Sequence, residues 1–122
     1  MDNRQCKIVV TNNPLVSLKI KEGEILFFET DNLGVFKKVR DKIHLGHKLL
    51  THPLAGSIKP WETPYRTVLL TKDKGVLDVE SLQLIEDSIE MCLKSTSKNQ
   101  KDCLSESVLL DFQLIDLDLI FG

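Results

Sequence analysis

The side chains that could do chemistry gather in one stretch of this chain. Residues 44–65 hold all three histidines, three of the four prolines, and the only Trp and Tyr. His52 is the most informative of these residues, because it follows a short apolar run that predicts a strand and it opens a proline-rich loop. This loop, His52–Tyr65, has fourteen residues, and loops of that length without a helix are usually functional or disordered. Its proline and aromatic content favours an ordered loop.

We predict a ligand site where this loop meets the end of the first expected strand, residues 7–11. Asn12 and Asn13 follow that strand, and His52 follows the strand expected at residues 48–51. Amide, hydroxyl, imidazole and ammonium groups would meet there, and this set suits a small anionic or amino-acid-like ligand without a further cofactor. The predicted ligand-binding residues are Asn12, Asn13, Thr51, His52, Gly56, Ser57 and Lys59.

Other interpretations of the same residues stay open. Asn-Pro and His-Pro pairs also cap turns, so these side chains could simply hold loops in place. A carboxylate from residues 29–31 beside His52 would allow general acid–base catalysis. No glycine-rich nucleotide motif and no Gly-x-Ser-x-Gly elbow occurs, so the catalytic residues of such an enzyme are unknown. We therefore favour a non-enzymatic protein.

A metal site is not expected among the histidines. His47 begins the strand at residues 48–51 and His52 follows it, which separates them by about 16 Å of extended chain. Metal–ligand bonds are about 2 Å long, so one ion cannot reach both side chains.

Composition limits the class of protein. The chain has 122 residues, which predicts a single domain over 1–122, and its net charge of -2 argues against nucleic-acid binding. No apolar run is long enough to cross a bilayer, and the first residues lack the apolar core of a signal peptide. Three cysteines without a Cys-x-x-Cys pair suit a reduced protein, so we expect a cytoplasmic location.

The hydrophobic pattern alternates between strands and helices. It predicts an α/β fold: a small three-layer sandwich of about four mostly parallel strands with helices on both faces, in a Rossmann-like or flavodoxin-like topology. In the expected strand order, residues 25–29 form one edge, followed by 7–11, 48–51 and 66–71. This order places Asn12 and His52 at the end of the sheet where strands 7–11 and 48–51 finish. His44 and His47 would lie at the opposite end. Helices are expected over 14–20, from Asp31 to Gly46, after Asp78, and over 104–121.

The last expected helix has two apolar stripes on nearly opposite sides. One contains Val108, Phe112, Ile115 and Leu119, and the other contains Leu110, Leu114, Leu117 and Phe121. A sheet can cover only one of them. The second stripe either packs on another helix of the same chain or, as we predict, forms the interface of a homodimer or of a partner. Asp111, Asp116 and Asp118 are expected to stay in water as its polar flanks.

Three segments together resemble a known family. They are Val-Thr-Asn-Asn-Pro at 10–14, the run from Gly46 through the His-Pro-Leu-Ala-Gly-Ser of residues 52–57, and Lys-Pro at 59–60 with Glu-Thr-Pro-Tyr at 62–65. The chain resembles the GrdX family, small proteins encoded beside the glycine, sarcosine and betaine reductase complex of amino-acid-fermenting anaerobes. The resemblance implies a cytoplasmic accessory protein with a reductase-complex subunit as a possible partner. It implies no activity and no site residues.

Overall fold

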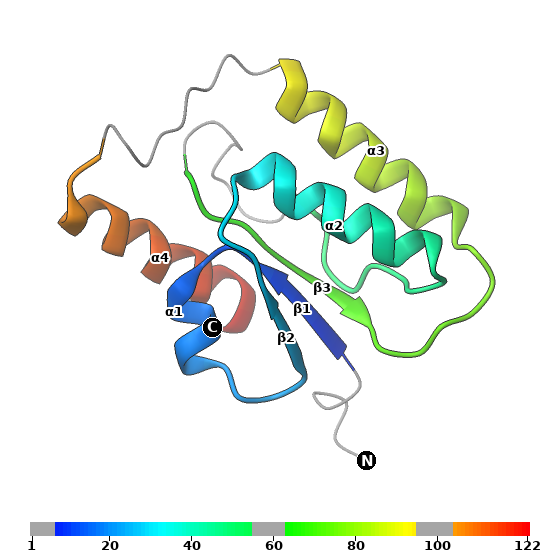
Figure 1. Cartoon of the computed structure of the whole chain (residues 1–122), viewed down its shortest axis with the longest axis horizontal. Coiled ribbons are helices and arrows are strands. Elements are labelled where there is room, and N and C mark those ends of the chain that lie inside the picture. Colours follow the sequence, from blue (N-terminus) through cyan, green and yellow to red (C-terminus); the bar gives the residue numbers. More distant parts are fainter. Residues whose placement is uncertain (1–6, 55–62, 95–103) are drawn as a thin grey trace.

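The computed structural model describes residues 7–54, 63–94 and 104–122 (Figure 1). Strands and helices alternate through the first half of the chain, and two helices follow the last strand. In chain order the elements are β1 (Lys7–Thr11), α1 (Pro14–Lys19), β2 (Glu24–Phe27), α2 (Asn32–His44), β3 (Thr67–Thr71), α3 (Val79–Lys94) and α4 (Glu106–Phe121).

The described strands form a mixed sheet in the order β2-β1-β3. β1 runs parallel to β2, with Val9 opposite Ile25, and antiparallel to β3, with Val9 opposite Leu69. β1 is buried from Ile8 to Thr11, and β3 is buried from Thr67 to Leu70. Because both strands are covered on both faces, their continuous apolar runs suit the middle of the sheet.

The expectation of four mostly parallel strands in a Rossmann-like topology is wrong. Residues 48–51 form only one antiparallel bridge, Leu49 to Leu70, on the outer edge of β3. β3 therefore lies between β1 and this segment, and it runs in the opposite direction to both. The physical reason is burial, since Lys48 and Leu50 are exposed and Leu49 is only half-buried, whereas Thr67–Leu70 is wholly buried. The half-exposed segment 48–51 therefore lies at the edge of the sheet, outside β3.

Helices cover both faces of the sheet (Figure 1). α2 and α3 pack on the face that carries Ile8, Val10, Val68 and Leu70, and they supply most of the larger core cluster. α1 and α4 cover the opposite face, where the buried apolar cluster of the described residues consists of Val9, Val16 and Leu69. α4 completes this smaller cluster with the half-buried residues Leu117, Ile120 and Phe121. No helix among the described ranges has the length and apolar content needed to cross a membrane.

The helix ends follow local sequence signals. Asn13 caps α1, since its Oδ1 accepts a hydrogen bond from Leu15 N at 3.0 Å, and Pro14 occupies the first turn. Asp31 caps α2 by accepting from Gly34 N at 2.8 Å. Gly46 ends α2 with a φ of 109°, a conformation that glycine adopts without steric cost.

We predict that Gly46→Ala destabilises the protein by about 1–3 kcal/mol, the usual cost of a residue held in an unfavourable backbone conformation. A Cβ at this position would also collide with the backbone carbonyl oxygen of Gly75. Gly75→Ala is the matched control, because no atom lies within 4 Å of its added Cβ. Urea unfolding of both variants tests the prediction, and equal midpoints for the two variants would contradict it.

Candidate functional site

Asn12 joins three segments of the chain at the carboxyl end of β1. Its Nδ2 donates to the carbonyl oxygens of Thr30 at 2.8 Å and Pro64 at 2.9 Å, and its Oδ1 accepts from Arg66 N at 2.8 Å. The side chain is 1% exposed. Its hydrogen bonds go to backbone groups, so Asn12 holds the segment before β3 against the β2–α2 connection.

Asn13 belongs to a buried polar network that reaches α4. Its Nδ2 donates to Asp116 Oδ2 at 3.0 Å and to Gln113 O at 2.9 Å. Thr67 Oγ1 donates to the same Asp116 oxygen at 2.6 Å and lies 2.8 Å from Thr11 Oγ1. We call Thr11, Asn13, Thr67 and Asp116 the buried network. It connects β1, β3, the start of α1 and the middle of α4.

Burial raises the pKa of the Asp116 carboxyl above its ordinary value. Hydrogen bonds from Thr67 and Asn13, followed by the attraction of Arg66, act in the opposite direction without overcoming burial. Burial also lowers the pKa of Arg66, which the charge of Asp116 partly offsets. The expectation that Asp116 is a solvated flank is therefore wrong, since its side chain is buried.

Thr51 and His52 lie on the other side of β3 from Asn12. Thr51 Oγ1 accepts from Leu69 N at 3.0 Å, while Asn12 N donates to Arg66 O across the β1–β3 pair. Two strand spacings amount to about 10 Å, so the topology separates residues that the sequence placed on neighbouring strands. Of the predicted ligand residues, Gly56, Ser57 and Lys59 lie outside the described ranges.

His52 is exposed, and its Nδ1 accepts from Leu54 N at 3.0 Å. This local bond shapes the start of the loop. The predicted site thus divides into two kinds of residue. Asn12, Asn13 and Thr51 bond other segments of the fold, and His52 is the one described member with an exposed side chain.

The other histidines lie at the opposite end of β3. His47 is buried, and its Nδ1 lies 2.7 Å from the carbonyl oxygen of Thr71, the last residue of β3. His44 is the exposed last residue of α2. Within the described residues, no three His, Cys, Asp or Glu side chains are grouped as metal ligands.

Cys92 packs against the larger core cluster from α3. Burial raises the pKa of its thiol to about 11. Only the thiolate is a good nucleophile or metal ligand, so burial disfavours the reactive form of this residue. It behaves as a small apolar side chain in the core.

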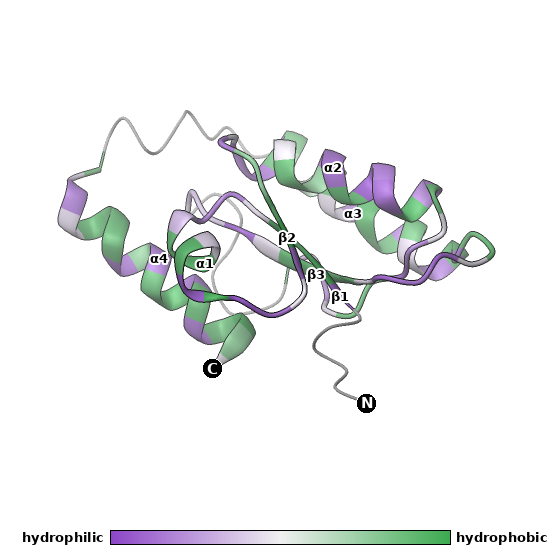
Figure 2. Ribbon diagram, turned by 60° about the horizontal axis from the view of Figure 1, so that its bottom comes forward, coloured by the Kyte–Doolittle hydropathy of each residue, from purple (hydrophilic) through white to green (hydrophobic). Residues whose placement is uncertain are grey.

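α4 turns part of its apolar surface outward. Leu117 and Phe121 pack on the smaller core cluster, whereas Leu110 and Leu114, from the same predicted interface stripe, are 47% and 46% exposed. Five apolar residues of α4 are exposed, and together we call them the outer face. Leu110 and Leu114 lie on one side of the helix, and Val108, Ile115 and Leu119 lie on another. In Figure 2 much of the α4 ribbon is green, with purple bands between its hydrophobic residues, whereas α2 shows a broad hydrophilic stretch in purple.

Sequence reasoning missed the roles of Asp116, Arg66 and Tyr65. All three are buried, and Tyr65 Oη accepts a hydrogen bond from Gln113 Nε2 at 2.9 Å. A signal for Asp116 existed, because it lies between Ile115 and Leu117 in a helix rich in apolar residues. A carboxylate in such a position must either face water or find hydrogen-bond donors.

A family model described as GrdX-like protein matches residues 8–122. The match covers essentially the whole described chain, so this protein belongs to the GrdX-like family and the resemblance found in the sequence is confirmed. No curated protein and no solved structure matches the chain.

We predict that Asp116→Ala lowers the free energy of unfolding by about 1–3 kcal/mol, because buried donors lose their acceptor. Asp116→Asn keeps one acceptor oxygen and should lose less. Since the native pKa of Asp116 is raised, this carboxyl stabilises the fold most when protonated, below the ordinary Asp pKa of about 4, and less as the pH rises through its native value. The stability of the wild type relative to Asp116→Asn should therefore increase from pH 7 to pH 4 in urea unfolding; a decrease would contradict the raised pKa.

The ligand site at His52 stays a prediction, and calorimetry can test it. His52→Ala should change the thermal midpoint little, because an exposed hydrogen bond contributes at most about 1 kcal/mol. It should abolish any stabilisation that glycine or betaine gives the wild type. His44→Ala, which removes an exposed histidine at the other end of the sheet, is the control. Equal ligand-induced shifts in both variants would exclude His52 from binding.

Proposed function

Because the chain belongs to the GrdX-like family, we propose that it is a non-enzymatic accessory protein of the glycine, sarcosine and betaine reductase system. It acts in the cytoplasm by docking onto a subunit of that system through the outer face of α4. The family supports the link to the reductase, and the exposed apolar surface of α4 supports the docking role.

The observation that carries this proposal is the exposure of the outer face. Its five apolar side chains are between 37% and 47% exposed. Single exposed apolar residues are common on monomers, but five of them on one helix are typical of an interaction surface. Helices presented in this way bind partners through side chains spaced three and four residues apart.

The charges beside the outer face indicate the chemistry of the partner. Asp111 and Asp118 are exposed on α4, and the sequence 106–121 contains no Lys or Arg. A partner surface with an apolar stripe and flanking Lys or Arg residues would complement this helix. Two copies of α4 would instead bring acidic side chains together without cations from either helix, so a reductase subunit fits better than the homodimer expected from the sequence.

The proposal predicts that Leu110→Glu with Leu114→Glu weakens binding to the partner subunit by at least about tenfold, a loss of 1.4 kcal/mol. Isothermal titration of the protein against each purified reductase subunit measures this. Binding by the wild type should weaken with added salt, because exposed charge pairs are screened. Both substituted side chains are about half-exposed, so the variant should fold.

Val76→Glu with Val79→Glu is the matched control, since it places two carboxylates on apolar residues that are 88% and 71% exposed and lie before and at the start of α3. The control should bind like the wild type. Failure of every subunit to bind would overturn the proposal. A wild-type mass twice that of the monomer by light scattering, lost in the α4 variant, would assign the outer face to a second copy instead.

A further inference from the structure

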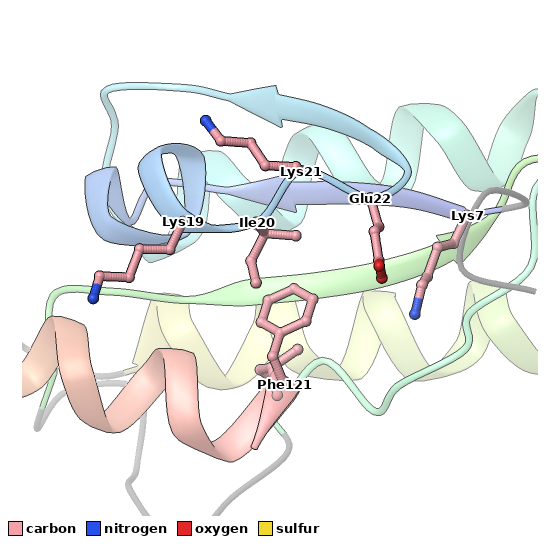
Figure 3. Close-up of a pocket in the computed structure, with 7 residues that line it drawn as sticks. Lys7, Lys19, Ile20, Lys21, Glu22 and Phe121 are labelled. Atoms are coloured by element: carbon pink, nitrogen blue, oxygen red, sulfur yellow. The ribbon is translucent and has the colours of Figure 1, made fainter.

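A pocket lies between the end of α1 and the end of α4, away from the outer face and from the buried network (Figure 3). Its volume is about 450 Å³, within the range of small-molecule sites. It is lined by Lys7, Lys19, Ile20, Lys21, Glu22, Ile120 and Phe121. Lys7 begins β1, so the pocket lies at the end of the sheet opposite Asn12.

The middle of the pocket is apolar. Figure 3 shows the side chains of Ile20 and Phe121 pointing toward one another across it. Ile20, Ile120 and Phe121 are half-buried and pack against the smaller core cluster. Their remaining surface faces the pocket and water, and an apolar molecule that covered it would be bound favourably.

The rim of the pocket is cationic. Three lysines and one glutamate line it, which gives 3 − 1 = +2, whereas the whole chain carries -2. In Figure 3, Lys7 and Glu22 lie at one end and Lys19 extends outward at the other. Lysine stems can lie along apolar surface while the ammonium group stays in water, so these side chains can approach an anion at the mouth of the pocket.

From this arrangement we propose that the pocket binds an anionic amphiphile, a molecule with an oxyanion head and a compact apolar body. The apolar body lies between Ile20 and Phe121. The head lies at the rim, beside the lysines at positions 19 and 21. This site is separate from the outer face of α4, so its test does not depend on the partner-docking function.

Octanoate, octyl phosphate and octylammonium are suitable probes, applied to the ¹⁵N-labelled full chain and followed by amide chemical shifts. Octanoate should give saturable shifts at Lys7, Ile20, Glu22 and Phe121. If the rim prefers a doubly charged head, octyl phosphate should bind more tightly than octanoate. If it prefers a carboxylate, octanoate should bind more tightly than octyl phosphate. Shortening the carboxylate should weaken binding about fourfold for each methylene removed from the apolar region.

Lys19→Glu with Lys21→Glu should weaken octanoate binding at least tenfold. Lys37→Glu with Lys38→Glu makes the same charge change at two exposed positions on α2, over the opposite face of the sheet, and should leave binding unchanged. Three results would each overturn the proposal: equal affinity of the two variants, equal shifts with octylammonium, or non-saturating shifts spread over the surface.

Discussion

The hydrogen bonds that Asp116 accepts from Asn13 and Thr67 determine how α4 packs on the rest of the fold. Among the described residues, the space between the sheet and α4 holds a small buried apolar cluster, formed by Val9 and Leu69 of the sheet and Val16 of α1. The hydrophobic effect is proportional to buried area and is not directional, so this small cluster alone does not fix how α4 is rotated about its axis. Hydrogen bonds are directional, and a buried carboxylate that loses them is strongly destabilising. The network therefore sets the rotation of α4.

The rotation of α4 decides which of its apolar side chains meet the domain and which meet water. With Asp116 directed inward, the neighbouring residues Leu117 and Ile120 pack on the sheet. Residues on the side of the helix away from Asp116, including Leu114, remain exposed. The same placement brings Phe121 to the pocket beside Ile20. The proposed docking surface and the proposed ligand pocket thus share one structural cause, although different residues carry them.

The asparagines after β1 illustrate how position differs from role. Asn12 and Asn13 lie at a strand end, where ligands often bind in α/β proteins, and their chemistry suits such binding. In the folded chain both polar atoms of the Asn12 amide form hydrogen bonds to the backbone of other segments. Asn13 caps α1 and also donates a hydrogen bond to Asp116. The sequence thus identified residues that matter to the fold, because buried polar groups need hydrogen-bond partners and these amides supply them to several backbone groups.

By itself the sequence determined the local elements, because their signals are local. Asn13-Pro14 and Asp31 begin helices, Gly46 ends one, and the Ile85–Ile89 spacing marks the buried side of α3. It also contained the family motifs. Only the tertiary structure decided that Thr67–Thr71 lies beside β1 and that residues 48–51 form the edge, since strand order depends on which run gains most from burial on both faces. It likewise decided that Asp116 points inward, because its donors are about 50 and 100 residues away in the chain.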